Sequence, residues 1–403
     1  MTQRILLVNK FYYPRGGDCV VTLNTEALLR SRGHEVAVFS MQYPENIESE
    51  WSKYFASEVS FDGSIKAKLA ALRRTLGMGG IKKSFIRMLD EFKPDVVHLH
   101  NIHSYLSPVV ARLAKQRGCR VVWTLHDYKL LCPSYACLRN GEPCELCYNS
   151  KLNVLTKRCM KGSLAASAIA WMEALKWNRK QLERNVDAFI CPSQFMAQKM
   201  EQGGFDPAKL HVLCNFVDPV KMQSYESLTV GEREPYYCYV GRLSQEKGIA
   251  TLLEVAQSLP FALKVAGSGP LEQELRDKYG GVNHIEFLGR LDAQQVADLL
   301  SHATCSVTPS ACYDNNPLSV IESLCAGTPV AGAEIGGIPE LIDNGNGLTF
   351  VWGDAEELKQ AIDEAFHRNW NNADIQQQAL NDFSNENHYK KLMSIYENKQ
   401  AEQ

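Results

Sequence analysis

The sequence predicts an α/β protein built from two parallel sheets, each covered by helices. Its 403 residues are too many for one ordinary hydrophobic core and suit two domains. Apolar strands that alternate with helices are typical of parallel sheets buried on both faces, so we expect two Rossmann-like domains. Strand-like runs occur in two successive series, at residues 4–9, 35–40, 95–100, 120–125 and 187–193, then at residues 236–241, 261–267, 284–289 and 304–310.

The order of these runs also predicts the domain boundaries. Residues 216–235 have a weak pattern and contain two prolines, which indicates a linker. We expect an N-terminal domain over residues 1–214 and a C-terminal domain over residues 215–383. The last helical pattern, residues 386–399 within the segment 384–403, is expected to pack back on the N-terminal domain.

Composition narrows the classes of function. Hydrophobic residues make up 45% and charged residues 22%, and the formal net charge of -3 gives no reason to expect a nucleic-acid partner. No uncharged apolar run reaches the ~18 residues of a membrane-spanning helix. The N-terminus also lacks the layout of a signal peptide. We therefore expect a cytoplasmic protein without an integral membrane part.

The short motifs that could carry chemistry follow the predicted strands. Ligands of open α/β sheets bind outside the carboxyl ends of the strands. If the two domains face each other by these edges, one interdomain cleft collects every motif. In the first series the motifs are Gly16-Gly17, His100-Asn101 and His126-Asp127, and in the second they are Gly241-Arg242, Gly267-Ser268-Gly269 and the stretch from Ser310 onward.

Two of these motifs suit a phosphate. Gly16-Gly17 opens a helix, where the backbone can approach a phosphate, although a plain strand–helix turn fits equally well. Arg242 and Lys247 place a planar fork and a point charge at one strand–helix junction, which suits a pyrophosphate more than it suits a solvated loop. The dinucleotide fingerprint G-x-G-x-x-G is absent at Gly16, which disfavours NAD.

The stretch from Asp314 to Glu322 predicts two carboxylates at the start of a helix. Asn315-Asn316-Pro317 is typical of a helix cap followed by proline in the first turn, and Gly327 marks the end of the helix. Asp314 then lies just before the helix and Glu322 more than one turn inside it. The helix N-terminus between them favours an anion.

Histidines near the strand ends raise the question of a metal. His98 and His100 share one strand face, but His103 lies beyond the strand, so a polar ligand contact is favoured over a metal. His126 suits a contact with a substrate hydroxyl, and a core histidine is the alternative.

Thirteen cysteines, an odd number with several in predicted strands, indicate reduced thiols rather than a disulfide framework. Five of them have the spacing C-x4-C-x6-C-x2-C-x11-C in a long loop. This spacing is compatible with a structural zinc, less so with an iron–sulfur cluster, and also with simple reduced thiols. The five are Cys132, Cys137, Cys144, Cys147 and Cys159.

Residues 64–87 are strongly basic and contain no acid. Ile65, Leu69, Leu72 and Leu76 share one face of a predicted helix. A basic amphipathic helix can rest on an anionic membrane, pack on its own domain with its charges solvated, or contact a phosphate-bearing acceptor. The cations are Lys66, Lys68, Arg73, Arg74, Lys82, Lys83 and Arg87.

Taken together, these motifs resemble the retaining glycosyltransferases of the GT-B fold, specifically glycosyltransferase family four (glycosyl transferases group 1). The resemblance covers nearly the whole chain, and the order and spacing of the motifs make it specific. It rests on Gly16-Gly17, TLHDY (124–128), NFVD (215–218), VGRLSQEKG (240–248), GSGP (267–270), FLGR (287–290), PSACYDNNP (309–317) and GGIPELI (336–342).

The resemblance implies two Rossmann-like domains facing across a cleft. A nucleotide-diphosphate sugar would bind mainly to the C-terminal domain, and a glycan or lipid-linked acceptor mainly to the N-terminal domain. Arg242 and Lys247 would neutralise the diphosphate, Glu322 would hold the ribose, and Asp314 and His126 would contact the donor sugar. Gly17 would lie near the phosphate. The other implied donor-binding residues are Gly16, Gly267, Arg290, Asn315, Asn316, Pro317 and Leu318.

The implied activity is retaining and metal-independent transfer, without a required cofactor, in cell-surface polysaccharide synthesis. It would take place in the cytoplasm or at the inner face of the cytoplasmic membrane. No residue marks a covalent nucleophile, so the resemblance implies front-face displacement. A sugar-nucleotide epimerase or hydrolase of the same fold is the alternative, followed by a non-catalytic sugar-nucleotide-binding protein.

Two residues depart from the family pattern. Asp314 stands where the family has glutamate, so its side chain is shorter by one methylene. Phe216 stands where the family usually has glycine. Because positive φ is costly for phenylalanine, we expect the turn at Phe216 to be of another kind.

Overall fold

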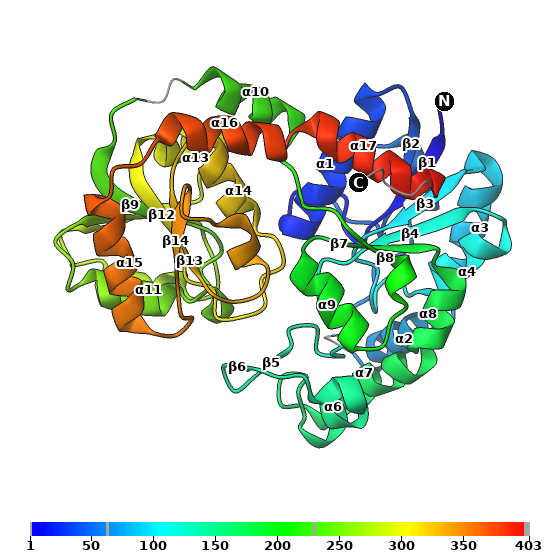
Figure 1. Ribbon diagram of the computed structural model, residues 1–403. Coiled ribbons are helices and arrows are strands. Elements are labelled where there is room, and N and C mark those ends of the chain that lie inside the picture. The colour runs from blue at the N-terminus through cyan, green and yellow to red at the C-terminus, as the bar shows by residue number, and fades with distance from the viewer. Residues whose placement is uncertain (1, 62–63, 229–230, 399–403) are drawn as a thin grey trace. The chain divides into compact units, whose positions relative to one another are not determined.

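The computed structural model describes residues 2–61, 64–228 and 231–398 (Figure 1). The chain divides into two compact units. Unit 1 contains the residues up to Arg139, Cys144–Leu213 and the chain from Tyr389 onward, and unit 2 contains Asn140–Pro143 and Cys214–His388. Residues 229–230 of the predicted linker and the end of the predicted C-terminal helix at residue 399 lie outside the described residues.

Unit 1 is built on a six-stranded sheet in the order β2-β1-β3-β4-β7-β8. Every neighbouring pair of strands is parallel, which confirms the predicted α/β architecture. The three-residue edge strand β8 is too short to show in the sequence pattern. The strands are β1 (Arg4–Val8), β2 (Glu35–Phe39), β3 (Val96–Leu99), β4 (Arg120–Thr124), β7 (Ala188–Cys191) and β8 (Leu210–Val212).

Helices connect the strands of unit 1 and pack around its sheet (Figure 1). The connection from β4 to β7 is the longest and also holds two short strands, β5 (Leu138–Arg139) and β6 (Glu142–Pro143). The helices are α1 (Gly17–Ser31), η1 (Glu50–Tyr54), α2 (Ile65–Thr75), α3 (Ile81–Phe92), α4 (Val109–Gln116), α5 (Leu146–Asn149), α6 (Leu152–Thr156), α7 (Leu164–Lys176), α8 (Arg179–Asn185), α9 (Gln194–Gln202) and η2 (Pro207–Lys209).

The basic segment 64–87 forms two helices, not one. α2 ends before Gly77, whose φ is +72° and whose missing Cβ would lie 2.8 Å from the Trp177 ring, so this turn requires glycine. The four apolar residues of the predicted face all lie in α2 or at its C-cap, so the division into two helices leaves them on one helix. Ala71 is buried, whereas Leu69 is 54% exposed. Arg74 is also buried and donates hydrogen bonds to backbone carbonyls, so it is a structural cation.

The last helix of the chain, α17 (Asn385–Glu397), covers the sheet of unit 1. The hydroxyl of Tyr396 lies 2.7 Å from Nδ1 of His98 in β3. The guanidinium of Arg120 in β4 donates two hydrogen bonds, of 3.0 and 2.7 Å, to the carbonyl of Ile395. Leu392, Ile395 and Tyr396 are buried in the core cluster that includes residues of β1 and β3.

Unit 2 contains a second parallel six-stranded sheet, in the order β11-β10-β9-β12-β13-β14. The strands are β9 (Glu234–Val240), β10 (Ala262–Ala266), β11 (Ile285–Gly289), β12 (Ala303–Thr308), β13 (Val330–Ala333) and β14 (Gly347–Phe350). The helices are α10 (Pro219–Ser227), η3 (Gln245–Lys247), α11 (Ile249–Ala256), α12 (Glu272–Tyr279), α13 (Ala293–His302), α14 (Leu318–Cys325), η4 (Ile338–Leu341), α15 (Ala355–His367) and α16 (Asn372–Asp382).

Part of the predicted linker is a helix, so the linker prediction is wrong for α10. The side chain of Asp218 caps this helix, accepting hydrogen bonds from the backbone N–H groups of Val220 (2.8 Å) and Lys221 (3.2 Å). Met222 and Tyr225 are buried in the core of unit 2. Among residues 220–227 of this helix only Met222 and Tyr225 are buried, so it lacks the periodicity that a sequence pattern detects.

The turn at Phe216 confirms the predicted departure from the family. Phe216 is not among the described residues with positive φ. Its ring is fully buried and lies against His388, with the ring centroids 4.0 Å apart. A tilted aromatic pair therefore stands where the family usually has a glycine turn.

Candidate functional site

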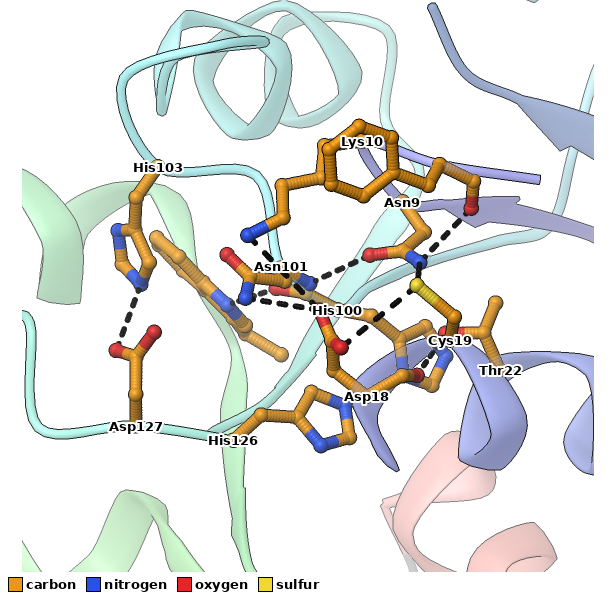
Figure 2. A network of polar contacts seen from close by, with 12 residues as sticks. Asn9, Lys10, Asp18, Cys19, Thr22, His100, Asn101, His103, His126 and Asp127 are labelled. Carbon is orange, nitrogen blue, oxygen red and sulfur yellow. Dashed lines mark hydrogen bonds and ion pairs between the residues drawn. The ribbon is translucent and has the colours of Figure 1, made fainter. Parts of the chain in front are cut away.

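The carboxyl ends of β1, β3 and β4 and the start of α1 bring a group of polar side chains together in unit 1 (Figure 2). We call this group the strand-end cluster. Parallel strands end at one edge of a sheet, which is why residues far apart in sequence meet here. The cluster consists of Asn9, Lys10, Asp18, His100, Asn101, His103, His126 and Asp127.

Asp18 lies at the centre of the strand-end cluster. Its Oδ2 accepts a hydrogen bond from the Asn101 amide (2.9 Å) and lies 4.0 Å from the Lys10 ammonium. Asn9 holds Asn101 in place by accepting a hydrogen bond from its backbone N–H. Burial alone would raise the pKa of the Asp18 carboxyl, but Lys10, His126 and the bond from Asn101 lower it below its ordinary value. Asp18 is therefore a carboxylate at neutral pH.

The histidines of the cluster are neutral, with His100 buried and His103 and His126 half-buried. Nδ1 of His100 lies 3.0 Å from Nε2 of His126. Burial lowers the pKa of both imidazoles, that of His100 strongly. His98 lies behind them, hydrogen bonded to Tyr396 and to Thr124 (2.7 Å each), so it serves the core and not a metal.

Asp127 and His103 form a second contact in the cluster. Nε2 of His103 lies 3.6 Å from Oδ1 of Asp127 (Figure 2). Burial lowers the pKa of His103 to about 3 and raises the pKa of Asp127. The imidazole is therefore neutral, and the contact is not an ion pair at neutral pH.

Gly16 and Gly17 begin α1 beside this cluster. Gly16 is the extended N-cap residue, and Gly17 has no atom within 4 Å of the position that a Cβ would occupy. Both glycines are exposed. The space beside Gly17 leaves room for a ligand, as the phosphate prediction for this turn requires.

In unit 2, glycines bring two backbone loops into contact at the ends of β9 and β10. Gly267 has φ of +139°, and a Cβ there would lie 1.8 Å from the carbonyl oxygen of Gly241. Gly248 has φ of +68°, and its Cβ would lie 1.8 Å from the carbonyl oxygen of Pro309. Any side chain at these positions would push the loops apart. The motifs around Arg242, Gly267 and Ser310 therefore form one continuous edge.

Lys247 and Asp314 meet at this edge. The ammonium of Lys247 lies 2.5 Å from Oδ2 of Asp314, and the hydroxyl of Ser310 donates to the same oxygen at 2.9 Å. Burial would lower the pKa of Lys247, but the charge of Asp314 raises it. The carbonyl of Asp314 accepts the N–H of Gly337 at 2.7 Å. A Cβ on Gly336 would lie 2.2 Å from that carbonyl, so the GGIPE turn packs closely against the backbone of Asp314 and fixes it.

Glu322 lies inside α14, as predicted, and is nearly buried. Its Oε1 lies 2.6 Å from the ammonium of Lys221 in α10. Sequence reasoning missed Lys221, because its segment was interpreted as a linker. Each acid of the predicted pair thus has its own lysine.

The predicted cap of α14 is wrong. Pro317 itself is the N-cap residue, and no side chain caps the helix, which begins at Leu318. Asn316 instead binds Asn215 by two hydrogen bonds of 2.8 Å, one to each backbone. This pairing with the chain before α10 draws Asn316 away from the helix start. Asn315 is also buried.

Arg242 and Arg290 follow β9 and β11 and are both exposed. Arg242 is held through its backbone, since its carbonyl accepts the Tyr239 hydroxyl at 2.8 Å. Its guanidinium lies in the loop that also leads to Lys247. The predicted cationic junction is therefore present in unit 2.

The five clustered cysteines lie in the long connection between β4 and β7. Among the described residues, no group of three or more His, Cys, Asp or Glu side chains is placed so that it could hold a metal ion. Cys132, Cys137 and Cys147 are buried, and all thirteen cysteines of the chain are free thiols. The structural zinc remains a prediction from the spacing alone.

Sequence reasoning also missed Asp18 and Lys10. The available signal was position, because Lys10 lies two residues after β1 and Asp18 directly follows Gly17.

No helix among the described residues is long and apolar enough to cross a membrane.

The two units, each with a parallel six-stranded sheet covered by helices, fit the two-domain, Rossmann-like GT-B fold of glycosyltransferases. Residues 15–221 match the family model described as Glycosyltransferase Family 4, and residues 222–382 match the model described as Glycosyl transferases group 1. The chain belongs to glycosyltransferase family 4, which confirms the resemblance.

Relatives of the chain include proteins of polysaccharide gene regions. An uncharacterised 42.6 kDa protein of the cps region of Klebsiella pneumoniae is 27% identical over 354 residues, covering 84% of this chain and 87% of the relative. The putative colanic acid biosynthesis glycosyltransferase WcaL of Salmonella typhimurium is 27% identical over 199 residues, covering 46% of this chain and 49% of WcaL.

Solved structures show the same fold. HepE of Anabaena in complex with UDP superposes with a TM-score of 0.64 at 17% identity, covering 98% of this chain and 100% of HepE. Sucrose-phosphate synthase of Thermosynechococcus elongatus superposes with a TM-score of 0.67 at 18% identity, covering 98% of both chains. Identities this low establish the fold and not the substrate.

Proposed function

We propose that the protein is a retaining glycosyltransferase that uses a nucleotide-diphosphate sugar to glycosylate a hydroxyl of a glycan or lipid-linked acceptor in cell-surface polysaccharide synthesis. The observation that carries the proposal is the Lys247–Asp314 pair beside the Arg242 loop. The cps-region and colanic acid relatives favour polysaccharide synthesis. The UDP bound to HepE favours a nucleotide-sugar donor.

The donor diphosphate binds at the edge of unit 2. An ammonium has three N–H donors, and Asp314 occupies one from Lys247, which leaves donors for phosphate oxygens. The raised pKa of Lys247 keeps it charged. Arg242 supplies a second, exposed cation. Asp314 and Ser310 hold the ammonium in position, and Asp314 also accepts hydrogen bonds from the donor sugar.

The chemistry is a front-face displacement. The bond between the sugar anomeric carbon and the phosphate oxygen breaks while the acceptor oxygen bonds to the same face of that carbon. The acceptor proton passes to the departing phosphate, so the products are the glycoside and the nucleoside diphosphate. Lys247 and Arg242 stabilise the negative charge that develops on the leaving group, without a metal ion.

The acceptor binds at the strand-end cluster of unit 1. Asp18 is a charged hydrogen-bond acceptor that can receive an acceptor hydroxyl, and Asn101 and Lys10 orient it. His126 is neutral and can hydrogen bond a sugar hydroxyl without adding charge. The cluster therefore suits a polyhydroxylated acceptor.

The lipid-linked form of the acceptor is favoured by the basic helices α2 and α3. Lys66, Lys68, Arg73, Lys83 and Arg87 are exposed there. Clustered cations attract anionic lipid headgroups. Flotation with anionic vesicles tests this contact. Charge reversal of Lys82 and Lys83 should weaken it, and binding that is unchanged and insensitive to salt would contradict it.

A thermal-shift screen across UDP-, GDP- and ADP-sugars tests the donor proposal. The correct donor should raise the melting temperature by mass action, and Lys247→Ala should abolish the rise. With donor and acceptor together, NMR should find the anomeric configuration of the donor kept in the product, at a rate that EDTA leaves unchanged. Turnover of the donor without any acceptor would instead identify an epimerase or hydrolase.

A further inference from the structure

The helix α7 presents its apolar side to solvent. Its polar residues Ser167 and Glu173 are buried. Ser167 accepts a hydrogen bond from the N–H of Met160, and Glu173 receives bonds from the backbone and hydroxyl of Ser104. Leu164 is 53% exposed and Leu175 is 49% exposed. This is the reverse of a surface helix in a water-soluble domain.

The two exposed leucines of α7 belong to one apolar stripe. Leu164, Ala168, Met172 and Leu175 follow one another at intervals of four, four and three residues, which places them on one helical face. Ala168 and Met172 are half-buried between the two exposed leucines. We call these four residues the α7 stripe.

Other exposed apolar residues gather in the same part of unit 1. Seven of the eleven large apolar side chains that are exposed among the described residues lie between positions 69 and 175. α6 packs against α7, and the indole N–H of Trp177, just beyond α7, donates to the carbonyl of Thr75 in α2 at 2.9 Å. Figure 1 shows α6 and α7 together at the end of the unit. The seven are Leu69, Met78, Tyr135, Leu146, Leu152, Leu164 and Leu175.

The charges around the α7 stripe are positive. Between residues 146 and 182 the sequence contains one acid, the buried Glu173. Exposed cations stand on both sides of α7, which makes the surroundings complementary to an anionic surface and repulsive to a second copy of the same face. These cations are Lys157, Arg158, Lys161, Lys176 and Lys180.

We propose that the α7 stripe inserts into the headgroup region of an anionic lipid bilayer, with the flanking cations on the headgroups. Interfacial helices bind in this way, with the apolar face buried in the bilayer boundary and Lys or Arg beside it. The inference deepens the proposed function, since it rests on a lipid-linked acceptor. It adds an apolar anchor, in a different helix, to the electrostatic contact of α2 and α3.

Vesicle flotation of the full chain tests the proposal. We expect the protein to float with phosphatidylcholine vesicles that contain phosphatidylglycerol and not with phosphatidylcholine alone. The double variant Leu164→Ser/Leu175→Ser should lose about tenfold or more of its bound fraction. The matched control is Ile47→Ser/Val351→Ser, which changes residues that are 43% and 45% exposed elsewhere, and it should float like the wild type.

Equal flotation of the α7 variant and the wild type, or no flotation of the wild type, overturns the proposal. A wild type that fails to float but forms dimers by light scattering, with a monomeric α7 variant, would show that the stripe joins two copies. The thermal shift with a nucleotide sugar is measured on the same variants. The Leu164→Ser/Leu175→Ser variant should show the same thermal shift as the wild type. If no nucleotide sugar shifts the melting temperature of either protein, the proposed function is contradicted. The flotation result then still tests the α7 stripe independently.

Discussion

Nδ1 of His100 lies 3.0 Å from Nε2 of His126 at the carboxyl edge of the unit 1 sheet. A contact of this length between two neutral imidazoles holds one proton, so the tautomer of one ring determines the tautomer of the other. Burial lowers the pKa of both rings. A second proton on this contact would charge one of the rings and place two N–H groups against each other at this edge of the sheet.

The lowered pKa values of three histidines predict that stability falls as the pH drops below about 6.5. His100, His103 and His126 all have folded pKa values below the ordinary value, so the unfolded chain binds more protons in this range. Each histidine that stays neutral costs up to about 1.4 kcal/mol per pH unit. The thermal midpoint at pH 5.5 should therefore lie below that at pH 7.5.

The variant His103→Gln tests the cause of this loss. It removes one buried imidazole, so its midpoint should fall less between pH 7.5 and pH 5.5 than that of the wild type. Asp18 does not interfere, because its lowered pKa places its own loss of stability below about pH 4. An identical fall in both proteins would show that other groups titrate.

Asp18→Asn tests the acceptor side of the site. The amide keeps the size of the side chain but removes the charge that receives an acceptor hydroxyl. We expect kcat/KM to fall about 10²-fold or more, as for the loss of a group that positions a reactant. The thermal shift with the donor sugar should be unchanged. Asp292→Asn, which changes the cap of α13, is the control and should keep full activity. A lost donor response in Asp18→Asn would place the residue on the donor side.

Asp314→Glu tests whether the shorter acid suits this protein. The backbone of Asp314 is fixed by Gly337 and Gly336, and its carboxylate already meets Lys247 and Ser310. One added methylene would displace the carboxylate by about 1 Å, and we expect a fall of about 10- to 10²-fold in kcat/KM. Increased transfer by the glutamate variant would contradict this and support a binding protein that has lost its activity.

Gly267→Ala tests the loop contact of unit 2. Its φ of +139° and the 1.8 Å approach to the Gly241 carbonyl exclude a side chain without backbone movement. We expect a loss of about 2 kcal/mol or more in stability and a smaller thermal shift with the donor. Gly281→Ala, which has open space at its Cβ position, should change the melting temperature little. Similar melting temperatures for the two variants would contradict the predicted strain.

The strands and the loop edge of unit 2 could be predicted because local patterns encode them. Arg242, Lys247 and Asp314 each follow a strand, and the apolar runs of β9 and β12 are long enough to recognise. The residues that pair with Glu322 and Asn316 could not be predicted from local patterns. Lys221 reaches Glu322 from 101 positions away, and Asn316 pairs with Asn215 over the same separation. Such contacts arise from tertiary packing, which no spacing rule describes.

Helix α17 determines when unit 1 can finish folding during synthesis of the chain. Tyr396 and Ile395 supply buried partners for His98 and Arg120, so the sheet whose strands lie in roughly the first half of the chain lacks its cover until residue 396 has left the ribosome. Unit 1 must therefore wait for the whole of unit 2 to be synthesised. During translation His98 and Arg120 stay open to solvent, and a ribosome that stalls within unit 2 would leave an incomplete first sheet for the cell's chaperones and proteases to recognise.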